Sequence, residues 1–129
     1  MVTRELAPSH SEIKTAWFGD VYVIAVFGEL DRNGADPLRV ELERIDRLGG
    51  RTIVVDLLSV PFIASTALGV LVAAARRVGQ AKGRFILVAD DPRTLRELQR
   101  TGLDRVFALE RTLSAAVDAA IGVGKAGSA

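Results

Sequence analysis

The chain has 129 residues, the usual length of one domain, and 49% of them are hydrophobic, which is enough for a single packed core. Its 17 lysines and arginines are balanced by 16 aspartates and glutamates, so it lacks the general positive field that holds nucleic acid or an anionic membrane surface. The absence of cysteine excludes disulfides and thiolate metal sites.

No apolar run reaches the roughly 18 residues that cross a bilayer. Residues 1–10 lack the apolar core of a signal peptide. We therefore expect a cytoplasmic protein without membrane insertion.

Two strands are predicted after a flexible N-terminus of residues 1–11. Residues 12–18 and 21–27 are apolar runs on either side of Gly19-Asp20, a turn dipeptide typical of paired strands. The second run, Val-Tyr-Val-Ile-Ala-Val-Phe, is apolar at nearly every position, which indicates a strand buried on both faces.

A helix is predicted to start at Asp36-Pro37, because aspartate caps free amides and proline fits the first helical position. Its apolar face repeats every three or four residues, and Gly49-Gly50 ends it. The apolar run at residues 52–58 is the next buried strand.

The second half repeats this alternation. A helix with an apolar stripe begins at Ser65, whose hydroxyl is placed to cap it, and a strand covers residues 84–89. Asp91 caps a third helix, and Thr112 caps a last one that ends near residue 121. The Gly-rich tail 122–129 is predicted to be disordered.

Alternating strands and helices predict an α/β fold with parallel strands, and the initial hairpin adds one antiparallel pair. We therefore expect a mixed, mostly parallel sheet of four to five strands with about four helices.

No group of residues predicts catalysis, a metal site or a cofactor. Ser65 has no matching base, because His10, the only histidine, lies in the polar leader. No Gly-rich phosphate loop follows a strand. Basic residues between Arg76 and Arg111 alternate with apolar stripes, as solvated helix faces do. We expect a binding protein and not an enzyme.

Four segments in order resemble the STAS domain family. They read Gly28-Glu-Leu-Asp31, Ile53-Val-Val-Asp-Leu57, Pro61-Phe-Ile-Ala-Ser-Thr-Ala-Leu-Gly-Val-Leu71 and Thr101-Gly-Leu-Asp-Arg-Val-Phe107. The resemblance covers residues 12–121 and is to the anti-sigma factor antagonists. It implies a STAS fold that binds an anti-sigma factor which is also a serine kinase, releases the sigma factor, and is switched off by phosphorylation.

The resemblance also assigns roles to residues of this chain. The phosphoacceptor falls on Ser65, with Thr66 as second choice, and the acidic residue that meets a basic residue of the kinase falls on Asp31. Leu68 and Gly69 match the end of the motif and complete the expected partner-binding set.

This sequence departs from the motif at two positions. Ala64 replaces the motif's aspartate, which removes a carboxylate beside the acceptor hydroxyl. Ala67 replaces its first glycine, which adds a methyl group where we expect the partner backbone to approach.

Two other interpretations stay open. STAS domains also serve as subunits of lipid transport or signalling assemblies without a phosphorylation switch, and Ala64 favours that alternative. Some bind nucleotides, although no phosphate cradle is visible here. We expect a monomer or weak dimer.

Overall fold

The computed structural model describes residues 11–128, with side chains to residue 121. Within these residues the elements follow one another as β1 (Glu12–Phe18), β2 (Val21–Phe27), α1 (Arg32–Arg47), β3 (Thr52–Ser59), α2 (Ser65–Gln80), β4 (Arg84–Val88), α3 (Pro92–Arg100), a 3-10 turn (Leu103–Arg105), β5 (Ala108–Glu110) and α4 (Leu113–Ser128).

The five strands form one sheet in the order β1-β2-β3-β4-β5. β1 and β2 are antiparallel, and the pairs β2–β3, β3–β4 and β4–β5 are parallel. The hairpin turns at Gly19, whose φ of 62° lies in the left-handed region that glycine adopts without a steric cost. The predicted mixed, mostly parallel sheet is confirmed.

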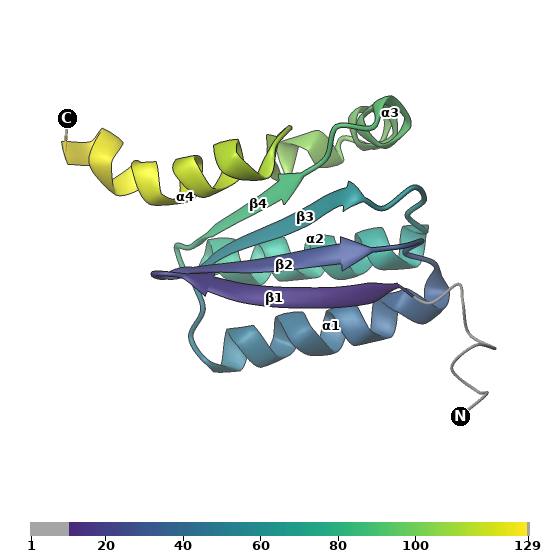
Figure 1. Ribbon diagram of the computed structural model, residues 1–129, viewed down its shortest axis with the longest axis horizontal. Coiled ribbons are helices and arrows are strands. Elements are labelled where there is room, and N and C mark those ends of the chain that lie inside the picture. The colour runs from purple at the N-terminus through teal and green to yellow at the C-terminus, as the bar shows by residue number, and fades with distance from the viewer. Residues whose placement is uncertain (1–10, 129) are drawn as a thin grey trace.

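Helices cover both faces of this sheet (Figure 1). α1 and α2 lie on one face, where their apolar stripes and alternate strand residues form the larger core cluster. α4 lies on the other face, where Ala116 packs among a smaller cluster from β2, β3 and β4. Alternate residues of a strand point to opposite faces, so two covered faces explain the nearly continuous apolar runs of β2 and β3.

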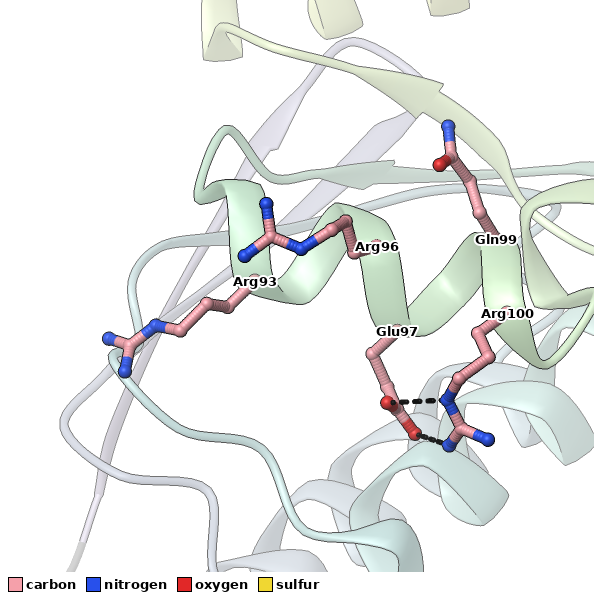
Figure 2. Close-up of a pocket in the computed structure, with 5 residues that line it drawn as sticks. All are labelled: Arg93, Arg96, Glu97, Gln99 and Arg100. Atoms are coloured by element: carbon pink, nitrogen blue, oxygen red, sulfur yellow. Dashed lines mark hydrogen bonds and ion pairs between the residues drawn. The ribbon is translucent and has the colours of Figure 1, made fainter.

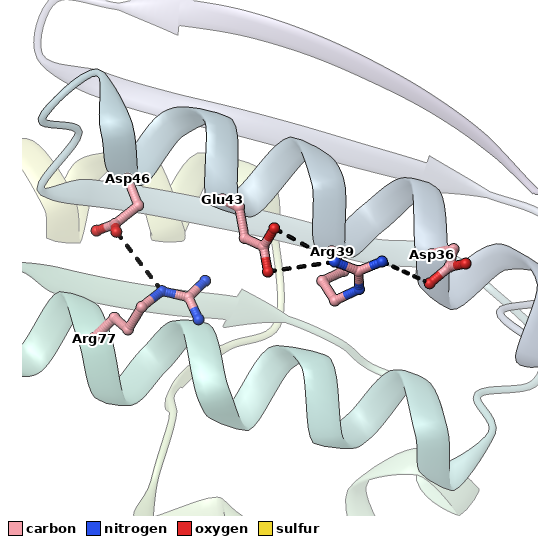
Figure 3. Close-up of polar contacts among 5 residues, drawn as sticks. All are labelled: Asp36, Arg39, Glu43, Asp46 and Arg77. Atoms are coloured by element: carbon pink, nitrogen blue, oxygen red, sulfur yellow. Dashed lines mark hydrogen bonds and ion pairs between the residues drawn. The ribbon is translucent and has the colours of Figure 1, made fainter.

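α1 begins earlier than predicted. Its N-cap is Asp31 and the helix starts at Arg32, so the predicted start at Asp36-Pro37 is wrong. Asp36 instead forms an exposed ion pair with Arg39 (3.0 Å; Figure 3). Pro37 is the sixth residue of α1 and lies inside the helix, where its fixed φ is helical but it has no N–H to donate to the carbonyl of Asn33. On the same surface, Asp46 and Arg77 join α1 to α2 at 3.8 Å.

Two further differences concern the C-terminal part. The sequence did not single out β5, which has only three residues. α4 continues to Ser128 and so includes most of the tail 122–129 that glycine content predicted to be disordered. Residues 1–10, which make up most of the predicted flexible N-terminus, lie outside the described residues, as does Ala129. Within the described part of the chain, none of the helices combines the length and apolarity needed to cross a bilayer.

Candidate functional site

The candidate site lies where β2 and β3 end and the main chains of the two following loops are joined. Gly28 N donates to Ser59 O (3.2 Å), Leu30 N donates to Phe62 O (2.8 Å), and Ala64 N donates to Leu30 O (2.8 Å). The Leu30 side chain is fully buried beneath this junction. Because the carboxyl ends of parallel strands share one edge of the sheet, these bonds hold the starts of α1 and α2 side by side.

Asp31 is the residue with which the first of these loops ends. It has the extended backbone of an N-cap, and its Oδ1 accepts a hydrogen bond from Gly34 N at 3.0 Å. The carboxylate is half-buried. The structure therefore gives the predicted partner-contact residue a definite role in starting α1, and its contact with a partner stays a prediction.

Ser65 is the first residue of α2, and it is exposed. The N-cap is Ala64, with φ −76° and ψ 157°, and no side chain caps the helix. The prediction that the Ser65 hydroxyl caps α2 is therefore wrong, because Ser65 lies one position too far into the helix to reach the free amides as an N-cap side chain does. Its hydroxyl remains accessible, as a phosphoacceptor must be.

The other predicted contact residues divide between surface and core. Thr66 and Gly69 are exposed, whereas Leu68 is 7% exposed and belongs to the larger core cluster. Ala67 is 0% exposed. The expectation that its methyl group meets the partner backbone is therefore wrong, because that methyl group lies in the core.

A hollow lies between the start of α2 and α3, which we call the α2–α3 hollow. Its volume is about 370 Å³, and its lining residues are Pro61, Phe62, Ile63, Ala64, Ser65, Leu68, Asp91, Arg93, Thr94 and Glu97. Phe62 is 52% exposed at its rim. The sequence did not identify Phe62 or the α3 residues as part of the site, because only the folded chain brings α3 to α2.

The α3 side of the hollow carries a cluster of charges. Asp91 caps α3 as predicted, accepting from Thr94 N and Thr94 Oγ1, each at 3.1 Å. Figure 2 shows the outer surface of α3, where Glu97 pairs with Arg100 at 2.7 Å. The side chains of Arg93 and Arg96 extend away from this ion pair. The surface beside Ser65 is thus apolar on the loop side and charged on the α3 side.

One cluster of groups with shifted pKa values lies between β2 and α1. The Tyr22 hydroxyl donates to Glu41, and Arg44 donates to both of them, at 3.0 Å to the hydroxyl and 2.8 Å to the carboxylate. The hydrogen bond from Arg44 lowers the pKa of Glu41, against the effect of its partial burial. Burial and the bond to Glu41 raise the pKa of Tyr22. This cluster ties α1 to the sheet.

The described side chains that could bind a metal ion or act as an acid or base are few near the site. Among them no group of three or more His, Cys, Asp or Glu residues is placed to hold a metal ion. His10 lies outside the described residues. Asp56, within β3, accepts from Leu58 N at 2.9 Å and so satisfies a nearby main-chain amide. Ser65 itself is exposed at the start of α2.

Comparison with known proteins gives a consistent result. The family model described as the STAS domain matches residues 12–118. The chain is 31% identical over 107 residues to anti-sigma-F factor antagonist RsfB of Mycobacterium tuberculosis. The aligned region covers 83% of this chain and 87% of RsfB.

Solved structures agree with this. An anti-sigma factor antagonist from Mycobacterium paratuberculosis has a TM-score of 0.80 at 32% identity and covers 88% of this chain and 97% of its own. A structure from Thermotoga maritima, also described as an anti-sigma factor antagonist, has a TM-score of 0.77 at 26% identity and covers 84% of this chain and 93% of its own.

Proposed function

Because the chain belongs to the STAS domain family and its relatives are named as anti-sigma factor antagonists, we propose that it binds an anti-sigma factor and thereby releases a sigma factor. The partner is an anti-sigma factor of the serine-kinase type, and phosphorylation of Ser65 ends the interaction. The protein acts in the cytoplasm by binding and not by catalysis.

The observation that carries this proposal is the junction of the two loops. It presents Ser65, Thr66 and Gly69 at the start of a packed helix, beside the exposed ring of Phe62. A rigid, partly apolar surface with a few polar groups is what a specific protein interface needs. A kinase that binds there reaches the Ser65 hydroxyl without any unfolding of α2.

The same geometry explains how a phosphate could act as a switch. Phosphorylation would add about −1.5 to −2 charges to an exposed residue at the amino end of α2. The helix tolerates an anion there because its dipole is positive at that end. A partner docked over Ser65, in contrast, would meet new bulk and added negative charge. The modification is therefore expected to remove the partner while leaving the fold intact.

The test compares three variants of the full chain used as bait in the native lysate. Ser65→Ala keeps the surface nearly unchanged, and Ser65→Asp adds a charge. Ser114→Asp is the matched control, because Ser114 is also exposed at the start of a helix but lies on α4. Captured proteins are identified by mass spectrometry, and the affinity of the purified partner is measured by calorimetry.

We expect an anti-sigma factor with wild type, Ser65→Ala and Ser114→Asp, and an affinity at least about tenfold weaker with Ser65→Asp, which corresponds to about 1.4 kcal/mol. Equal affinities for all variants would remove Ser65 from the interface. Capture of a transport ATPase or of a large signalling assembly in place of an anti-sigma factor would select the alternative of a STAS subunit without a switch, which the loss of the carboxylate at Ala64 favours.

A further inference from the structure

Arg93 is a cation in the α2–α3 hollow with no carboxylate partner among the described side chains. It is the second residue of α3 and lines the hollow together with Ser65. Among residues 11–121 no carboxylate oxygen lies within ion-pair distance of its guanidinium. Figure 2 shows its side chain extending from the start of α3, away from Glu97 and Arg100. Arg93 also lines a second hollow together with residues 58–61, so its side chain lies near the loop that leads to Ser65.

The two carboxylates that line the α2–α3 hollow already have partners. Asp91 accepts from the main chain and hydroxyl of Thr94. Glu97 pairs with Arg100 through bonds of 2.7 and 3.3 Å. Arg76 of α2 and Glu97 line a neighbouring hollow in which Ser65 also takes part. Within the α2–α3 hollow, Arg93 is therefore the positive charge left to meet a new anion at Ser65.

We propose that Arg93 is the intramolecular receptor for the phosphate of phosphorylated Ser65. The ion pair would link α3 to the start of α2 across the hollow and cover the apolar loop surface that the partner needs. Arginine suits this role because its planar guanidinium donates two parallel hydrogen bonds to phosphate oxygens. This inference rests on the proposed function, since it requires Ser65 to carry a phosphate.

Binding of the phosphate by Arg93 and simple repulsion of a partner predict different values for the second pKa of the phosphate in the free, phosphorylated protein. If the phosphate only repels a partner, its environment in the free protein resembles that of an exposed phosphoserine. If Arg93 binds it, the doubly charged form is favoured and the second pKa of the phosphate falls below its ordinary value of about 6. The charged groups around that phosphate are Arg93, Asp91 and Glu97 from α3 and Arg76 from α2.

The experiment installs phosphoserine at position 65 of the full chain during translation and follows the phosphate by phosphorus NMR as pH is varied. In the wild-type background we expect a second pKa lowered by about half a unit or more. Arg93→Gln should return it toward the value of a free phosphoserine peptide. Arg96→Gln, on the same helix but outside the α2–α3 hollow, should leave it lowered. Glu97→Gln should lower it further, because it removes a negative charge from the hollow.

An unshifted phosphate in the wild-type background, or the same titration in Arg93→Gln as in wild type, would overturn the proposal. Circular dichroism of each variant verifies that α3 is retained. The titration needs no partner protein, so it stands apart from the proposed function: a failed capture of an anti-sigma factor leaves the titration result intact, and an unshifted phosphate leaves the antagonist function intact.

Discussion

Ala64 provides a stability test of the helix start at the site. It has the extended backbone of an N-cap and no side-chain acceptor, so the first amides of α2 lack a capping partner. The family motif has an aspartate at this position, the residue type that caps helices well. The substitution Ala64→Asp should therefore supply the side-chain cap that α2 lacks, and it should stabilise the fold.

The magnitude follows from the geometry of this cap. Exchange between alanine and aspartate at an N-cap changes stability by roughly 0.5–2 kcal/mol, and typically by about 1 kcal/mol. The backbone of Ala64 already has the required φ and ψ, so the new side chain needs no main-chain adjustment. For a chain of this length, about 1 kcal/mol corresponds to an increase of about 4 °C in the melting temperature.

The assay is urea unfolding with calorimetric melting of wild type, Ala64→Asp, Ala64→Asn and Ala81→Asp. Asparagine caps without a charge and should recover most of the gain. Ala81 is the C-cap of the same helix, where a carboxylate meets the negative end of the dipole, so Ala81→Asp should cost about 0.3–1 kcal/mol. Refutation would be a neutral or destabilising Ala64→Asp, since the helix start would then already be satisfied.

Three other predictions concern single side chains. Phe62→Ala should weaken partner binding by roughly tenfold or more, because about half of this side chain is exposed at the rim of the hollow. For the same reason the unfolding midpoint should stay nearly unchanged. Phe18→Ala is the control, because Phe18 is 49% exposed but lies in the β1–β2 hairpin. Asp31→Asn should retain stability to within roughly 0.5 kcal/mol because asparagine still caps α1, whereas Asp31→Ala should cost about 1 kcal/mol in urea unfolding; weaker partner binding by the asparagine variant would assign a contact to the charge itself. The pKa of Glu41 is lowered in the folded state, so its carboxylate stabilises the fold at pH values above the pKa that this carboxyl has in the unfolded chain, about 4.3. This contribution is lost as the pH falls below that value, and Glu41→Gln should therefore flatten the acid limb of a stability–pH profile.

The sequence was sufficient to predict four of the five strands and the starts of α2, α3 and α4. Nearly continuous apolar runs with β-branched residues identified the buried strands at 21–27 and 52–58, because a sheet covered on both faces leaves no polar alternation. Asp91 and Thr112 were correctly identified as caps, and Thr112 Oγ1 accepts from Ala115 N at 3.0 Å. In these places local chemistry alone selects the structure.

The start of α1 was not predicted because two aspartates compete for it. Asp31 and Asp36 are both capping residues, and Pro37 directly after Asp36 fits the first position of a helix that would begin there. In the structure Pro37 is instead the sixth residue of a helix capped by Asp31. The main-chain bonds between Leu30 and the second loop favour the earlier start, and they depend on strand pairing that local sequence does not contain. The α2–α3 hollow was not predicted for the same reason.

The two departures from the motif have different physical consequences. Ala67 is enclosed in the core, so its methyl group adds packing and leaves the presented surface unchanged. Ala64 lies at the cap, where it removes a charge and an acceptor. Neither change affects the bonds from Leu30 to Phe62 and Ala64, because these use main-chain atoms only. The departures therefore alter the energetics of the helix start without altering how Ser65 is presented.

A helix start without a side-chain acceptor also changes what phosphorylation does to stability. A phosphate on Ser65 brings acceptor oxygens to free amides and to a positive dipole, so phosphorylation should raise the urea midpoint of this chain. In an Ala64→Asn background, where an uncharged side chain already occupies those amides, the increase should be smaller. Comparison of the two increases isolates the shared amides, because asparagine adds no charge that could repel the phosphate. Equal increases in both backgrounds would mean that the phosphate is stabilised by the helix dipole or by Arg93 and not by hydrogen bonds from these amides.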